Sequence, residues 1–210
     1  MSSALSTIQE QIQAAVASQK ENILPTGGRI NTKGKVFTLP DGTVINKPLE
    51  LIVLDYRFNN TYYQATWDGQ SANRPDCYAT GATNDALAPS ADVKDPVSED
   101  CTTCPMNAWG SAANGRGGKA CQNKVRLAVV TGDADLTSPI FTLDLTPTAL
   151  KSFGSYMDNA NKAGVLPINL LTEVSFVEAA TYPTLRMKAL EKNDDNLKLW
   201  SLRERAQNLL

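Results

Sequence analysis

The stretch from Asp68 to Asn123 constrains the fold of this chain more than any other feature. It holds all four cysteines, many glycine, asparagine, aspartate, serine and proline residues, and little hydrophobic periodicity. Strand-like apolar runs precede it and follow it. Compact domains rarely carry so long a loop without internal order. We therefore expect something other than a hydrophobic core to hold this stretch together.

The cysteines themselves are the candidate for that role. They are Cys77, Cys101, Cys104 and Cys121. Cys101 and Cys104 form a CxxC knuckle, in which two sulfurs can point into one tetrahedral site, and the distance on to Cys121 is typical of a zinc loop. Four thiolates suit a closed, structural Zn²⁺ site that would order the loop.

Other readings of the cysteines stay open on the residues alone. A single CxxC motif also occurs in disulfide or redox pairs and in iron–sulfur proteins, and the four thiols could be unconnected. Structural disulfides are rare in the reducing cytosol. The chain starts without the basic residues and apolar stretch of a secretory signal, so we expect a cytoplasmic protein.

Composition narrows the function. The chain has no histidine, which excludes Ser-His-Asp and Cys-His catalysis, histidine zinc sites and histidine pH switches. It has 20 Lys and Arg against 22 Asp and Glu, a net charge of -2. This balance excludes a uniformly basic nucleic-acid coat but not a local basic face. No apolar run reaches the roughly 18 residues that a membrane span needs.

Outside the cysteine-rich stretch, hydrophobic periodicity predicts mostly strands. We expect strands over 36–39, 44–45, 51–58, 61–67, 125–130, 140–145, 170–177 and 184–190. Pro40–Thr43 and Asn59–Asn60 are the expected hairpin turns. Helices are expected over 4–20, from a Thr146 cap with Pro147 to Gly164, and over 196–210.

This order of elements predicts a mostly-β protein with a few flanking helices. A partly open barrel of the OB type is the leading arrangement, beside other β-barrels and sandwiches. We expect an N-terminal helix and linker over 1–26, an OB-like domain over 27–190 with the zinc loop inserted at 74–124, and a helical tail over 191–210. The terminal helices are expected to pack on the core or to mediate homo-oligomerisation.

A local basic segment lies inside the cysteine-rich stretch. Between Pro105 and Val130 there is no acidic residue, and the cations are Arg116, Lys119, Lys124 and Arg126. Glycines 115, 117 and 118 would let backbone N–H groups approach an anion closely. A phosphate backbone fits this segment. The alternative is a solvated loop whose cations balance the acidic residues just before the CxxC knuckle.

Aromatic residues concentrate in the expected hairpin over 51–67. Neighbouring residues alternate between the two faces of a strand, so some of these rings must lie outside the core. Exposed rings beside cations are a stacking platform for single-stranded nucleic acid, worth about 1–3 kcal/mol per base. Core packing is the alternative, and it is preferred for Phe58. The candidate DNA contacts are Tyr56, Arg57, Tyr62, Tyr63, Trp67, Trp109, Arg116, Lys119, Lys124 and Arg126.

Three segments carry a family resemblance. Residues 74–78 (RPDCY) are similar to a "PPDCWS" element, 101–111 (CTTCPMNAWGS) to "C..CP.N.fGS", and 117–129 (GGKACQNKVRLAV) to "GkgkaC…RLavv". In order and spacing they resemble a family of bacteriophage single-stranded DNA-binding proteins. The resemblance spans roughly 27–190, and its specific part is 74–130.

The resemblance implies an OB-like core, zinc held by Cys77, Cys101, Cys104 and Cys121, and coating of single-stranded DNA during phage replication, recombination or repair. It implies no particular DNA-contacting residues. Two features depart from the family: the loop from Cys77 to Cys101 is long and acidic, and the sequence ends at Leu210 without an acidic tail. We therefore do not expect partner recruitment through a charged tail.

The sequence thus predicts a sequence-tolerant single-stranded DNA-binding protein with a structural zinc and no catalysis. One alternative is a zinc-stabilised module that docks phage or host replication or recombination proteins without binding DNA. Another is a nuclease in which Asp55, Asp68 or Asp76 recruits a second metal. The sequence offers no convincing DxD or ExK cluster at a strand end that would favour the nuclease.

Overall fold

The computed structural model describes residues 26–65, 73–113 and 117–210. The helix expected over 4–20, and the residues Trp67, Asp68 and Arg116, lie outside the described residues. No described helix combines the length and the apolar character that crossing a membrane would require.

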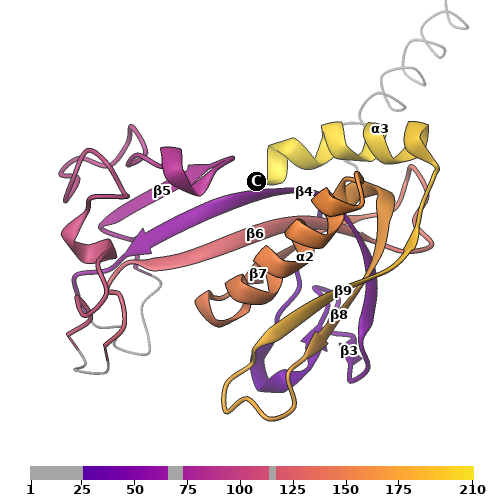
Figure 1. Ribbon diagram of the computed structural model, residues 1–210, viewed down its shortest axis with the longest axis horizontal. Helices are drawn as coiled ribbons and strands as arrows, with labels where there is room; N and C mark the ends of the chain where they lie inside the picture. The colour runs from indigo at the N-terminus through magenta and orange to yellow at the C-terminus, as the bar shows by residue number, and fades with distance from the viewer. Residues whose placement is uncertain (1–25, 66–72, 114–116) are drawn as a thin grey trace, which may run out of the picture.

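The described chain is mostly β, as predicted. Its strands are β1 (Thr26–Arg29), β2 (Phe37–Thr38), β3 (Val44–Ile45), β4 (Leu49–Tyr62), β5 (Cys77–Gly81), β6 (Gln122–Thr131), β7 (Ile140–Leu145), β8 (Leu170–Phe176) and β9 (Leu185–Lys192). Two helices, α2 (Leu150–Lys162) and α3 (Asn196–Ala206), lie on the sheet (Figure 1).

The main sheet is organised around β4 and β6. Its order is β1-β7-β6-β4-β8-β9, with β5 paired to β4, and every pair except β1–β7 is antiparallel. β2 and β3 form a separate hairpin. Within the described residues this path is open, running from β1 at one end to β9 at the other.

Several expected elements are confirmed. The hairpin of β2 and β3 turns through Gly42, which adopts φ 89, a conformation that glycine accepts without strain. β8, β9, α2 and α3 fall where hydrophobic periodicity predicts them. Pro147 begins a 3-10 turn that leads into α2, although the Thr146 side chain makes no capping bond to the backbone.

The hairpin expected at Asn59–Asn60 is wrong. β4 continues straight through both residues and pairs with β6 on one edge and β5 on the other. Asn60 is 3% exposed and lies opposite Asn123 of β6. Neither residue is a glycine, and partners on both edges of β4 satisfy the backbone here, so extended structure is favoured over a turn.

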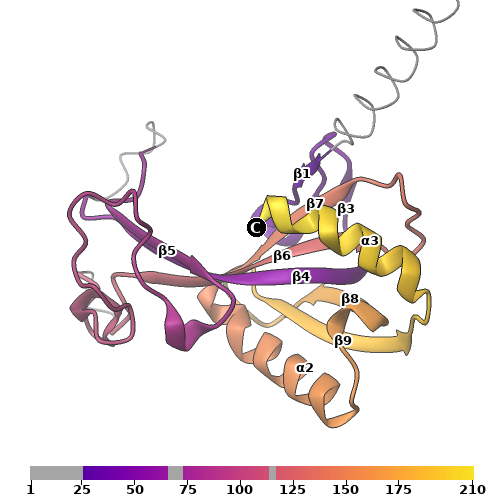
Figure 2. The ribbon, with the colours of Figure 1, turned by 90° about the horizontal axis from the view of Figure 1, so that it is seen from above.

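Two hydrophobic cores lie on opposite faces of the sheet. One packs α2 and the β2–β3 hairpin against a face that includes Leu51 and Val53. The other packs α3 against the opposite face, which includes Ile52 and Leu54. Figure 2 shows α2 and α3 on the two sides of β4. The amphipathic face of α3 is therefore used within the chain.

A β-bulge exchanges the two faces partway along β4. Simple alternation predicts Asp55 on the face of Val53, and Tyr56 on the face of Leu54. The β4–β6 register instead shifts between Val53 and Asp55, and Tyr56 packs in the α2 core, while Asp55 pairs with Arg203 of α3. An extra residue in one strand reverses the face of everything beyond it.

Candidate functional site

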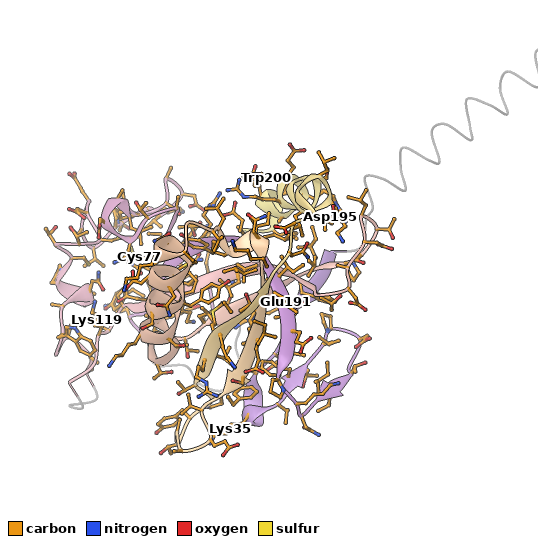
Figure 3. All side chains as sticks on the ribbon, turned by 45° about the vertical axis from the view of Figure 1, so that its right-hand side comes forward. Lys35, Cys77, Lys119, Glu191, Asp195 and Trp200 are labelled. Atoms are coloured by element: carbon orange, nitrogen blue, oxygen red, sulfur yellow. The ribbon has the colours of Figure 1, made fainter. Side chains whose placement is uncertain are left out.

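The candidate site lies where β4, β5 and β6 extend beyond the rest of the sheet. β7 pairs with β6 from Val125 to Val129, so among the described strands residues 122–124 of β6 have β4 as their only neighbour. The cysteine-rich loop closes the end of this three-stranded arm (Figure 1). Figure 3 shows Cys77 and Lys119 at this end, away from Glu191 and Trp200.

The structure brings all four cysteines to one small pocket. Cys77 begins β5, Cys121 immediately precedes β6, and Cys101 and Cys104 come from the loop between them. All four are free of disulfide bonds. Cys101 and Cys121 are buried.

Burial disfavours ionisation of two of the four thiols, Cys101 and Cys121. The pKa of Cys121 is raised to about 11, first by burial and then by the negative charge that Cys101, Cys104 and Cys77 would carry. The pKa of Cys101 is also raised, again chiefly by burial. A donor set of four mutually repelling sulfurs is chemically suited to a divalent cation.

The sulfurs do not form a finished metal site. Among the described residues, no group of three or more His, Cys, Asp or Glu side chains is arranged to hold a metal ion. The cysteines thus share one pocket without ligand geometry. The zinc expectation stays a prediction, and metal content is the direct test.

The loop also has a small core of its own, contrary to expectation. Ala79, Leu87 and Cys101 are buried together, with Phe58 packed against them. The sequence pattern does not predict β5. Because β5 pairs with β4, Ala79 lies beneath the loop. Three buried side chains are a minor core for a loop of this length.

An asparagine network joins the loop to the arm. Asn123 Nδ2 donates to Asn60 Oδ1 at 2.7 Å and to Asn107 Oδ1 at 3.0 Å. Asn107 Nδ2 donates to the Cys101 carbonyl at 2.7 Å. Lys119 Nζ donates to Asn107 Oδ1 at 3.1 Å and to Asn123 Oδ1 at 3.0 Å. β4, β6 and the cysteine loop are thereby fixed to one another.

We expect Asn123→Ala to lower the free energy of unfolding by about 1–3 kcal/mol, because it leaves partly buried amide groups of Asn60 and Asn107 without their partner. Urea denaturation measures this loss. Gln122→Ala is the matched control, because the Gln122 side chain is exposed on the same strand. Equal midpoints for the two variants would contradict a structural role for the network.

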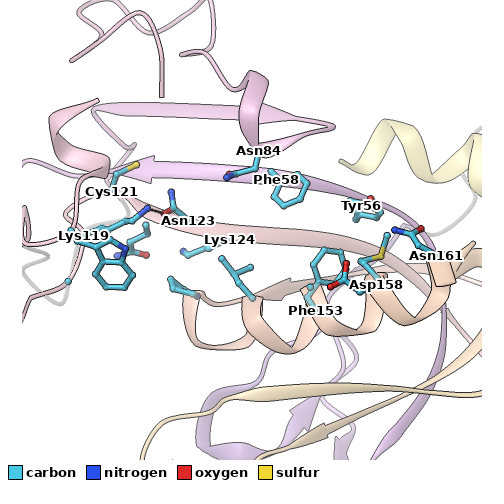
Figure 4. A pocket seen from close by; sticks show the side chains of 17 residues that line it. Tyr56, Phe58, Asn84, Lys119, Cys121, Asn123, Lys124, Phe153, Asp158 and Asn161 are labelled. Carbon is cyan, nitrogen blue, oxygen red and sulfur yellow. Dashed lines mark hydrogen bonds between the residues drawn. The ribbon is translucent and has the colours of Figure 1, made fainter. Parts of the chain in front are cut away.

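A groove of about 810 Å³ runs between the arm and α2. Aromatic rings, lysines and polar side chains line it (Figure 4). The rings are Tyr56, Phe58, Trp109 and Phe153, and the charged residues are Lys119, Lys124 and Asp158. The face reversal at the β4 bulge is what turns Tyr56 and Phe58 toward α2 and so into the groove.

Trp109 and Lys119 form the groove's end at the cysteine loop. Trp109 is 80% exposed, and Lys119 Nζ lies 5.7 Å from the centre of its ring. Lys119 is held by neutral amide oxygens, so its charge is available to an anion. A large exposed ring beside such a cation is the arrangement expected of a stacking platform.

The remaining predicted contacts lie elsewhere. Tyr62 lines the cysteine pocket, and Tyr63, 42% exposed, follows the end of β4 outside the groove lining. Arg57 pairs with Asp55, and Arg126 with Asp144, two buried carboxylates. Of the predicted contacts that the structure describes, the groove therefore gathers Tyr56, Trp109, Lys119 and Lys124.

Two carboxylates that a nuclease would use to bind a second metal, Asp55 and Asp76, are engaged by groups of the protein itself. Asp55 carries ion pairs from Arg57 and Arg203, and Asp76 Oδ2 accepts the backbone N–H of Gln64 at 2.7 Å.

The groove residues that the sequence does not single out come mainly from α2. Phe153, Asp158 and Asn161 line one wall, and Asn84 and Asn123 line the arm side. A polar pair beside an apolar stripe occurs on most surface helices, so no local signal distinguishes this helix as part of a site.

A scan of protein-family models, a search of curated proteins and a search of solved structures each found no match to this chain.

Proposed function

We propose that this protein binds single-stranded DNA in the groove between α2 and the arm, with little dependence on base sequence. The observation that carries the proposal is the groove itself, in which four aromatic rings and two lysines line one continuous cavity. Every base offers a π-face, so stacking on rings tolerates any sequence, while cations follow the phosphates.

The rings and charges of the groove suit this ligand. Tyr56 packs edge-on against Phe58 and Phe153, with ring centroids 5.9 and 5.2 Å apart. These three rings build an apolar wall, and Trp109 provides an open face for a base. Asp158 is the only carboxylate in the described lining, against Lys119 and Lys124, so the charge favours an anion.

The four cysteines would hold a structural Zn²⁺ within this function. When bound, the ion would replace mutual repulsion of the thiolates by attraction to one centre, and so fix the loop that carries Trp109 and Lys119. Cys77, Cys101, Cys104 and Cys121 are the proposed ligands. Their convergence on one pocket supports this assignment.

An OB-like arrangement of the sheet belongs to the same proposal. The β2–β3 hairpin lies across the gap between the two ends of the open sheet, where the rings of Phe37 and Phe176 are 4.5 Å apart. Asn31, two residues beyond β1, exchanges backbone hydrogen bonds with Thr38 of β2, which ties the hairpin to the β1 end of the sheet. Side-chain packing would complete the wall that hydrogen bonds leave open.

The sequence resemblance to phage single-stranded DNA-binding proteins gives the biological setting of the proposal. The protein would coat single strands during replication, recombination or repair in the cytoplasm of an infected bacterium. Phage or host replication and recombination proteins would be its partners.

Trp109→Ala tests the stacking role. We expect affinity for labelled oligo-dT to fall by about 1–3 kcal/mol, because one stacked base loses its platform, with almost no change in the salt dependence. Fluorescence anisotropy at several salt concentrations measures both quantities. Tyr182→Ala removes another ring, 66% exposed on a distant loop, and is the control. Equal affinity for the two variants would remove Trp109 from the interface.

A further inference from the structure

A row of cations lies on the face of the sheet that α3 covers, opposite the groove. Its members are Arg29, Arg57, Lys124, Arg126 and Arg203, contributed by β1, β4, β6 and α3. Arg57 and Arg126 face each other directly across β4 and β6. Like charges so placed repel, and the arrangement needs negative charge to be stable.

Two buried carboxylates supply part of that charge. The Asp144 carboxylate forms ion pairs with Arg126, whose Nε lies 2.8 Å from Oδ1, and with Arg29, whose Nη2 lies 3.1 Å from Oδ2. The Asp55 carboxylate forms ion pairs with Arg57, whose Nη1 lies 3.2 Å from Oδ1, and with Arg203, whose Nη2 lies 3.3 Å from Oδ2. Each carboxylate is 8% exposed and therefore inaccessible to a ligand.

The cations exceed the carboxylates, and they reach solvent. Five positive groups share two negative ones, so the row keeps a surplus of positive charge. Arg29 is 62% exposed, Arg126 37%, Arg203 31% and Arg57 27%. Guanidinium groups hold donors on several edges, so an arginine bound to a carboxylate on one side can bind a phosphate on the other.

Lys124 is placed in the same positive environment. Its pKa is lowered, first because it is half-buried and then because Arg29 and Arg126 repel its charge, while Asp144 acts in the opposite direction. An anion above the row would relieve this repulsion.

Lys124 also connects the row to the groove, because it lines the groove as well. It lies on the stretch of β6 that β7 leaves uncovered, since β7 ends at Leu145 opposite Val125. A single DNA strand that leaves the groove can therefore pass around this free edge of β6. It reaches the opposite face without crossing a paired part of the sheet.

We propose that the cation row is a phosphate track, which holds the backbone of the same single strand after it leaves the groove around the free edge of β6. This inference rests on the proposed function. It assigns the bases to the groove and the following phosphates to Arg29, Arg57, Arg126 and Arg203, with Lys124 at the junction.

The test is the double variant Arg29→Gln with Arg57→Gln. It removes two cations outside the groove but leaves Arg126 on Asp144 and Arg203 on Asp55, so neither carboxylate is left unpaired. The control is Arg186→Gln with Lys188→Gln, which removes two exposed cations from β9. Thermal unfolding of all variants verifies the fold, and Arg29→Gln alone replaces the double variant if that fails to fold.

The probes are labelled oligo-dT of about 4 and about 16 nucleotides, the two ends of the range of single-stranded site sizes. A phosphate contact on a single strand contributes about 0.7 to the slope of log affinity against log salt. On the long oligonucleotide only, we expect the double variant to reduce the magnitude of this slope by about 1.4. Arg29→Gln alone should reduce it by about 0.7. The β9 control should match the wild type on both.

Two results would overturn the track. An unchanged slope on the long oligonucleotide, while the wild type binds it, would show that these arginines touch no phosphate. An equal loss on the short and long oligonucleotides would show a general field effect rather than an extended path. If the wild type binds neither oligonucleotide, the proposed function fails and the track fails with it.

Discussion

Cys121→Ser is expected to release the bound zinc, loosen the loop from Cys77 to Cys121 and weaken single-stranded DNA binding at least about tenfold. Zinc contributes about 10–16 kcal/mol to the folding of small zinc domains, which is comparable to the whole stability of a typical protein. Serine is a poor substitute for a thiolate ligand. Elemental analysis of the purified protein and thermal unfolding with and without a chelator measure these effects.

Thr103→Ala is the matched control for this variant. Thr103 is exposed and lies between the two cysteines of the CxxC knuckle, so its change should leave the metal content near one zinc per chain. Undiminished zinc in Cys121→Ser would remove that cysteine from the site. A wild-type protein without zinc would contradict the proposed structural zinc. Stoichiometric iron in its place would indicate an iron–sulfur cluster instead.

Asp144→Asn is expected to lower the free energy of unfolding by about 3 kcal/mol. Removing one partner of a buried ion pair leaves the other charge uncompensated, at a cost of about 3–5 kcal/mol. The low end applies here because Arg29 and Arg126 remain partly hydrated. Urea denaturation measures the loss, with Asp158→Asn, an exposed carboxylate of the groove, as the control.

The same residue gives stability a predictable pH dependence. Burial by itself would raise the pKa of Asp144, but the Arg126 hydrogen bond and the charges of Arg126, Arg29 and Lys124 lower it below the ordinary 3.8. A lowered pKa in the folded state contributes stability above that ordinary value, and this contribution is lost as the pH falls through the folded-state value. As the pH falls below about 4, the free energy of unfolding of Asp144→Asn should therefore decrease less than that of the wild type.

Much of the fold follows from local rules. The turn Pro40–Thr43 combines a fixed φ at proline with a glycine that adopts φ 89, and the strands on either side form where expected. β7, β8 and β9 follow hydrophobic alternation, and the helical spacing of Leu199, Leu202 and Ala206 predicts the buried face of α3. In each case the signal lies within a few residues of the structure it specifies.

The two errors about β4 have a different origin. The bulge between Val53 and Asp55 depends on how β4 pairs with β6, far away in sequence. The asparagines at 59 and 60 look like a turn locally, yet Asn123 and β5 hold them in an extended strand. Long-range pairing overrides local preference here, and a single sequence contains no direct signal of that pairing.

The candidate site shows the same division. The shared cysteine pocket agrees with the spacing of the cysteines, because two of them lie on one knuckle and the others border β5 and β6, which pair with the two edges of β4. The groove does not follow from spacing, because α2 forms one wall and only the fold brings it to the arm. The bulge also separates Tyr56 from Arg57, placing the ring in the groove and the cation in the row on the other face.

Single-strand binding is measured most directly by fluorescence anisotropy of labelled oligo-dT titrated with the wild-type protein at low and moderate salt, with duplex DNA in parallel. We expect tight binding to the single strand that weakens as salt rises, and much weaker binding to the duplex. No binding to oligo-dT at low salt would contradict it, and would leave a zinc-stabilised module for protein interactions as the better explanation of this chain.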